Sequence, residues 1–89
     1  MNLILAFADT YEDGTTHWTA VIVHKNKNYY FDSYGADTPD SVRHLLGSNI
    51  VRSTYVIQNY DTYSSGEFSM LMIFLLVVRN MQYFDIVFL

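Results

Sequence analysis

The chain has 89 residues, of which 51% are hydrophobic and 16% are charged, and its formal net charge is −4. This length allows one small domain, and the high apolar content argues against a disordered chain. The absence of cysteine excludes disulfides, thiolate metal sites and a thiol nucleophile. The five Lys and Arg residues are spread along the chain without a basic patch, which weighs against nucleic acid as a partner.

The first half of the chain predicts three strands. Residues 1–8 are apolar and predict a buried strand, and they lack the basic start and the cleavage site of a signal peptide. Residues 17–23 and 29–34 are rich in aromatic and β-branched side chains, which favour strands. The polar segment 24–28 between them predicts a turn, so these two strands should form a hairpin.

A short helix and a fourth strand are predicted next. Thr38 can cap the helix, Pro39 suits the first helical position and Asp40 favours the positive end of the helix dipole. Gly47 should end this helix. Residues 50–58 then predict a strand.

A long helix is predicted from about residue 65 to residue 80, opened by a capping box of Ser64 and Glu67. It is apolar nearly all round, so we expect it to be the central core helix. Its apolar run, residues 70–78, is too short for a bilayer span, which takes about 20 residues. The order of elements predicts an α+β fold, with a mixed or antiparallel sheet packed on this helix.

Four residues at the ends of these elements could carry acyl-transfer chemistry. Asp32 ends one hairpin strand and His17 begins the other, so the carboxylate could accept the imidazole N–H and leave the second ring nitrogen as a base. Ser65 lies where a helix dipole would stabilise a thiolate. Gln58 could donate to an oxyanion beside the backbone N–H of residue 65. Each also has an ordinary alternative role, as a solvated His or Asp, a helix-capping serine or a polar residue ending a strand. The three histidines show no metal-ligand spacing, so we expect no metal and no cofactor.

Taken together, these motifs resemble those of the adenovirus protease (adenain) and of the SUMO-specific and other ubiquitin-like-protein proteases of the same clan. The runs that carry the resemblance are Gly14-Thr15-Thr16-His17-Trp18-Thr19-Ala20-Val21, Tyr29-Tyr30-Phe31-Asp32-Ser33-Tyr34-Gly35, Ile57-Gln58 and Ser64-Ser65-Gly66-Glu67-Phe68-Ser69. The short adenain-like proteases of DNA viruses, virophages and related mobile elements are the most similar. They have a Gly-Thr-His-Trp block, a Tyr-Phe-Asp-Ser-Phe/Tyr-Gly block and a Gln that precedes Cys-Gly at the same spacing.

The resemblance implies a papain-like or adenain-like fold and a single, truncated protease domain over residues 1–89. Family members usually carry a helical segment before the first strand and more chain after the core helix. The implied catalytic positions are His17 as general base, Asp32 as orienting acid, Gln58 as oxyanion donor and Ser65 at the nucleophile position, with Trp18 and Gly66 against the substrate.

The nucleophile position is the main departure from the family, because residue 65 is Ser and not Cys. Ser69 also stands where relatives often carry a second Cys. Both changes fit an engineered, inactivated chain and equally a natural degenerate copy. The implied function is a cysteine endopeptidase-family domain that processes viral precursor or ubiquitin-like proteins and is inactive in this chain. The alternative is a non-catalytic peptide-binding or structural pseudoprotease subunit.

The expected partner is a polypeptide substrate or an activating peptide. The apolar segments 1–8 and 83–89 also predict a homo-oligomer or a complex with another protein, because exposed apolar surface and open strand edges favour association. If the chain is viral, the resemblance implies a place in the virion or in the cytoplasm or nucleus of the infected cell. Otherwise it implies an intracellular protein.

Overall fold

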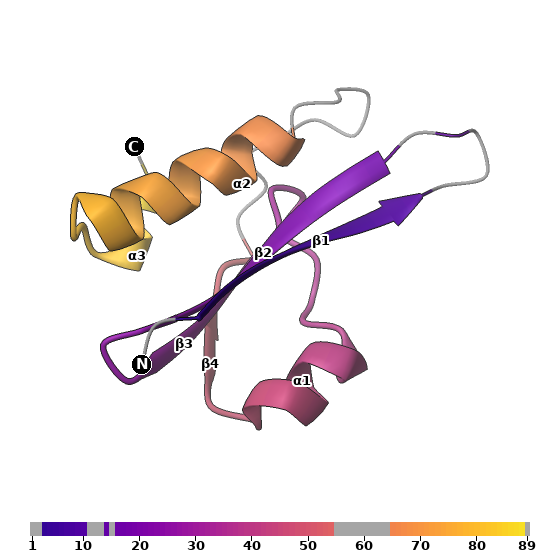
Figure 1. Ribbon diagram of the computed structural model, residues 1–89, viewed down its shortest axis with the longest axis horizontal. Coiled ribbons are helices and arrows are strands. Elements are labelled where there is room, and N and C mark those ends of the chain that lie inside the picture. The colour runs from indigo at the N-terminus through magenta and orange to yellow at the C-terminus, as the bar shows by residue number, and fades with distance from the viewer. Residues whose placement is uncertain (1–2, 11–13, 15, 55–64, 89) are drawn as a thin grey trace.

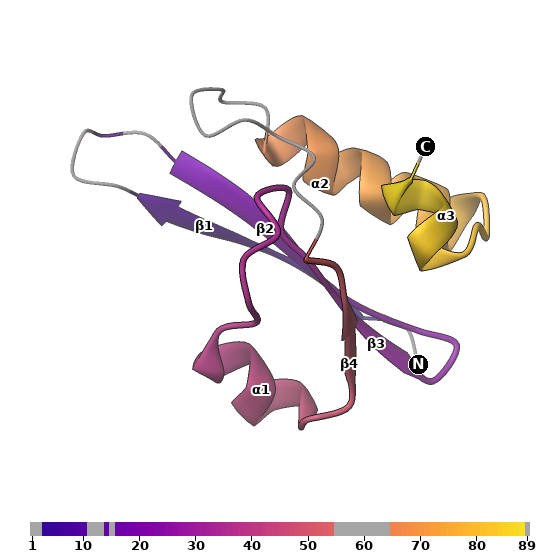
Figure 2. The same ribbon diagram turned by 180° about the vertical axis from the view of Figure 1, so that it is seen from behind.

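The computed structural model describes residues 3–10, 14, 16–54 and 65–88 and has the predicted α+β class. One sheet contains four strands in the order β1 (Leu3–Thr10), β2 (Thr16–His24), β3 (Lys27–Phe31) and β4 (Ile50–Arg52). β1 pairs with β2 and β2 pairs with β3 in antiparallel fashion, and β4 runs parallel to β3, so the sheet is mixed. The helices are α1 (Asp40–Leu46), α2 (Ser65–Ile73), its π-helical continuation η1 (Phe74–Val78) and α3 (Tyr83–Val87). Helix α1 lies to one side of the sheet, and α2, η1 and α3 lie to the other (Figures 1 and 2).

The predicted hairpin is formed by β2 and β3. Lys25 and Asn26 make its two-residue turn with φ angles of 51° and 62°, and positive φ at both positions is the geometry of a type I′ turn. The prediction that the second hairpin strand reaches residue 34 is wrong, because β3 ends at Phe31. The chain then turns over residues 32–35, where the Gly35 N–H donates to the Asp32 carbonyl at 2.9 Å.

The core has two layers because successive side chains of β2 point to opposite faces of the sheet. On one face Ala20 and Ile22 pack with side chains from β3, α2, η1 and α3, among them Phe31, Met72, Leu76, Tyr83 and Ile86. On the other face Val21 packs with Tyr30 of β3 and Val42 of α1. The central strand β2 is therefore covered on both sides.

The predicted core helix packs on the sheet, but with one side only. Met72 is only 1% exposed, but Met70 is 68% exposed, and Phe74 and Val78 also face solvent. Helix α2 lies on the outside of a single sheet, so it buries one side only. The helix ends at Val78 through a π-type turn, in which the Arg79 N–H donates to the Phe74 carbonyl at 3.1 Å.

The start of α1 also differs from its prediction. Pro39, and not Thr38, is the N-cap residue; it has an extended ψ of 153°, and the cap has no side-chain hydrogen bond. The Thr38 N–H instead donates to the Asp37 carboxylate at 2.7 Å. Gly47 ends the helix as predicted, with a φ of 84° that favours glycine.

Strand β4 is shorter than the predicted strand 50–58. It covers Ile50–Arg52, and Arg52 pairs with Tyr30 near the end of β3. Because β3 ends one residue later, at Phe31, it offers no further partner to β4. Residues 55–58 of the predicted strand lie outside the described residues. None of the helices in the described part of the chain has the length and apolar character needed to cross a membrane.

Candidate functional site

His17 and Asp32 form a buried side-chain pair. The distance between His17 Nε2 and Asp32 Oδ1 is 2.8 Å, and the two residues are 5% and 8% exposed. The pairing of β2 with β3 ends at Ala20 and Phe31, so β2 extends beyond the end of its neighbour. The turn that follows β3 brings Asp32 back to this extension. The hydrogen bond expected from the hairpin is therefore present, whereas the catalytic roles of the two residues stay predictions.

The imidazole of His17 is held by a second residue, Tyr34. The two rings stack with their centroids 4.3 Å apart and their planes within 9° of parallel. The Tyr34 N–H also donates to Asp32 Oδ1 at 2.8 Å, so one turn orients both the carboxylate and the aromatic ring. An ionised carboxylate can only accept, so His17 Nε2 carries the hydrogen of this bond and Nδ1 is the nitrogen that can act as a base.

Ser65 begins α2 and lies against the residue that follows His17. Its Oγ accepts a hydrogen bond from the Trp18 N–H at 2.9 Å, and the residue is 2% exposed. One turn further along, the Ser69 hydroxyl donates to the Trp18 carbonyl at 3.2 Å. Two serines of α2 thus bind both backbone polar groups of one residue in β2. The pairing of His17 as base with Ser65 at the nucleophile position, which the resemblance implies, stays a prediction.

The reason for this contact lies in the length of β3. Trp18 is beyond the last residue of β2 that pairs with β3, so its backbone cannot complete the ladder on that side. Residues four apart on a helix share a face, which lets Ser65 and Ser69 replace the missing strand. This role of Ser69 and the stacking of Tyr34 were not predicted from the sequence. The spacing of the two serines was a signal for the first, and no local pattern indicated the second.

Trp18 and Gly66, the two residues predicted to lie against a substrate, line an open cavity of about 540 Å³. A Cβ atom on Gly66 would lie 3.4 Å from Cδ1 of the indole, so the glycine lets α2 approach the ring closely. The residues that line the cavity are mostly apolar: Ala6, Trp18, Gly66, Glu67, Ser69, Met70 and Ile73. The arrangement places apolar surface and one carboxylate directly beside the first turn of α2.

Two further predictions concern Gln58 and the absence of a metal. Gln58, the predicted oxyanion donor, lies outside the part of the chain that the structure describes. Within residues 3–10, 14, 16–54 and 65–88, no group of three or more His, Asp or Glu side chains could hold a metal ion.

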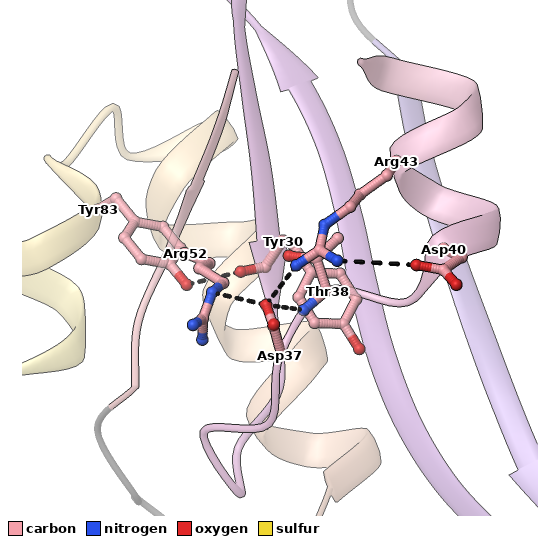
Figure 3. Close-up of polar contacts among 7 residues, drawn as sticks. All are labelled: Tyr30, Asp37, Thr38, Asp40, Arg43, Arg52 and Tyr83. Carbon is pink, nitrogen blue, oxygen red and sulfur yellow. Dashed lines mark hydrogen bonds and ion pairs between the residues drawn. The ribbon is translucent and has the colours of Figure 1, made fainter. Parts of the chain in front are cut away.

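A cluster of charged residues supports the loop that carries Asp32 (Figure 3). Asp37 Oδ1 lies 2.7 Å from a guanidinium nitrogen of Arg43 in α1 and 3.0 Å from Nε of Arg52 in β4. The hydrogen bond from Arg43 is the main cause that lowers the pKa of Asp37 below its usual value. Nearby, the Tyr83 hydroxyl donates to the Tyr30 carbonyl at 2.8 Å. These contacts connect α1, β4 and α3 around the end of β3.

Comparisons of the chain with models of protein families, with curated proteins and with solved structures found no match.

Proposed function

We propose that this chain is an adenain-like domain of the papain-like thiol-protease class, with Ser65 at the nucleophile position and no peptidase activity as a result. The observation that carries the proposal is the buried bond between His17 and Asp32, with Ser65 bound to the backbone of the next residue, Trp18. The resemblance adds the substrate class, viral precursor or ubiquitin-like proteins.

The chemistry of such a site depends on the residue at position 65. A thiol there would lie at the positive end of the α2 dipole, next to the strand residue that follows His17, and both features favour a thiolate. Nδ1 of His17, with Asp32 bound to Nε2, would hold the proton released by the thiol. A serine hydroxyl is far less acidic, so Ser65 stays protonated in the same surroundings.

A specific observation favours the second candidate, a non-catalytic peptide-binding or structural subunit. The hydroxyls of Ser65 and Ser69 both bind the Trp18 backbone, so each already has a structural role. The lining of the apolar cavity beside them includes Trp18, Gly66 and Ser69 but not Ser65. Such a domain could therefore hold a polypeptide without cleaving it.

The decisive experiment places a cysteine at position 65. The chain has no cysteine, so Ser65→Cys introduces a single thiol whose ionisation can be followed without a contribution from other thiols. We expect ultraviolet absorbance of the thiolate to give a pKa well below the ordinary value of about 8.5. Adding His17→Ala should return the pKa toward that value or above it. Absorbance reports ionisation directly, without requiring a probe to reach a sulfur that is 2% exposed as serine.

Two further variants serve as controls. Ser69→Cys places a buried thiol one turn further along the same helix, and Ser48→Cys places an exposed thiol in the loop after α1. Both should ionise at or above the ordinary pKa and respond little to His17→Ala. If the thiol at position 65 titrates like the one at position 48, with or without His17, the proposed function is wrong.

A further inference from the structure

The outer edge of β1 is open in the part of the chain that the structure describes. β1 lies at one end of the sheet order and pairs there only with β2, over the eight residues from Leu3 to Thr10 (Figures 1 and 2). Natural proteins usually protect such an edge with charged side chains, prolines or bulges. The run from Leu3 to Ala8 has no charged residue and no proline.

The contacts of Trp18 show which backbone groups face the open edge. Its N–H and C=O bind Ser65 and Ser69, so they do not bind Ala8, which lies opposite Trp18 in the ladder. Hydrogen-bonded and non-hydrogen-bonded pairs alternate along an antiparallel ladder. The N–H and C=O groups of Ile4, Ala6 and Ala8 therefore point away from β2.

The side chains of the same three residues lie on the face of the sheet that α2 covers only in part. They lie opposite Ile22, Ala20 and Trp18, which belong to that face. Ile4 is 43% exposed, and Ala6 and Ala8 are also exposed. The edge thus combines unpaired backbone groups with small and branched apolar side chains, and Ala6 also lines the cavity beside α2.

We propose that this edge pairs with the same edge of a second copy of the chain, antiparallel, about a two-fold axis at Ala6. This register pairs Ile4 of each copy with Ala8 of the other, so a large side chain lies opposite a small one and Ala6 lies opposite Ala6. It also uses every outward N–H and C=O group of the three residues. One continuous sheet then runs through both copies.

Charge favours a second copy over a different strand. Each copy brings an edge that carries no charge from Leu3 to Ala8, so pairing buries none. In the same register Asp9 lies opposite Leu3 of the second copy, which keeps the two Asp9 residues at opposite ends of the paired strands. An isologous contact of this kind closes after two copies and does not propagate into a fibre.

A charge exchange at Ala6 tests the proposal. Sedimentation equilibrium of the unmodified chain at micromolar concentration should give twice the mass of 10.4 kDa. Ala6→Glu and Ala6→Lys each place like charges directly opposite each other, which is destabilising, so each variant alone should have the monomer mass. An equimolar mixture of the two variants should restore the dimer, because opposite charges then meet at the axis.

The controls separate association from folding. Ala6 is exposed, so circular dichroism of both variants should retain the spectrum of the unmodified chain. Ala36→Glu makes the same change at an exposed alanine before α1 and should leave the dimer intact. A monomeric unmodified chain, a dimeric Ala6→Glu variant or a mixture that stays monomeric would each overturn the proposal. The inference does not depend on the proposed function, since no variant alters His17, Asp32 or Ser65.

Discussion

At the residue scale, His17 is restrained on two sides by groups from one short turn. Asp32 binds the edge of the imidazole, and Tyr34 covers its face. A ring held in both ways keeps one orientation, so the direction of Nδ1 is set before any other molecule arrives. The turn over residues 32–35 positions both groups, and it is closed by the hydrogen bond from the Gly35 N–H to the Asp32 carbonyl.

The buried hydroxyl of Tyr83 allows a test of how one side-chain hydrogen bond contributes to stability. Its ring is buried, its hydroxyl donates to the Tyr30 carbonyl, and burial is the main cause that raises its pKa above the ordinary value of 10.0. Tyr83→Phe leaves that carbonyl without this donor and should lower the free energy of unfolding at neutral pH by about 1–2 kcal/mol. Urea denaturation measures this loss.

The pH dependence of the same variant has a defined sign. Tyr83 stays protonated in the folded chain above pH 10, whereas in the unfolded chain it ionises there. The unfolded state then holds fewer protons, so stability falls as the pH rises above about 10, and below that pH this group contributes no slope. Tyr83→Phe should therefore lose less stability than the unmodified chain between neutral and alkaline pH. Equal losses in both chains would contradict this account.

At the scale of elements, α2 and η1 show why an apolar composition does not identify the buried face of a helix. Met70, Leu71 and Met72 are successive apolar residues, and only Met72 faces the sheet. The contacts of Ser65 and Ser69 with Trp18 orient the first turn of the helix. The face that these two polar residues share with Met72 becomes the buried one.

Two methionines of α2 provide a matched test of this orientation. Met72→Ala removes a side chain that is fully packed against β2 and β3 and should cost about 2–5 kcal/mol of unfolding free energy. Met70→Ala makes the same chemical change on the solvent side and should alter stability by less than about 0.5 kcal/mol. Urea denaturation of both variants compares them directly. Similar costs at the two positions would contradict the orientation in which Met72 faces the sheet and Met70 faces solvent.

At the scale of the whole molecule, the candidate site lies beyond the end of β3, where β2 continues without that neighbour. Beyond the end of β3, Asp32 reaches His17 from the following turn and α2 reaches Trp18 from the start of the helix. Asp37 forms ion pairs with Arg43 of α1 and Arg52 of β4. The loop between β3 and α1 is therefore held at its first residue, Asp32, by His17 and near its end, at Asp37, by these two arginines. The site therefore depends on the packing of all the layers.

The proposed function predicts that the unmodified chain has no measurable endopeptidase activity. Loss of a catalytic nucleophile costs on the order of 10⁶ in kcat and leaves only about 10³–10⁴-fold acceleration over the uncatalysed reaction. Incubation with unfolded proteins and peptide libraries, followed by mass spectrometry, should give no cleavage products. Cleavage that persists in Ser69→Ala and disappears in Ser65→Ala would contradict the prediction and make Ser65 a nucleophile.

Several features of this protein follow from local patterns in its sequence. Strand-forming side chains and the polar segment 24–28 were enough to predict the α+β class and the hairpin, because turn chemistry and side-chain period act over a few residues. The hairpin then joins His17 to Asp32, so their contact could be predicted as well. Gly47 ends its helix for a local reason too, since its φ is positive.

Only the tertiary structure decided where the strands stop and what the helix buries. β3 ends because the chain turns over residues 32–35 while β2 continues, and β4 ends near the last residue of β3. The hydrogen bonds between the Trp18 backbone and the side chains of Ser65 and Ser69 cross about half of the chain, so the spacing of the two serines indicates a shared face but not the residue that it binds. Long-range hydrogen bonding and packing select among elements that local preferences leave equally possible, and for this reason the exposed face of α2 became visible only in three dimensions.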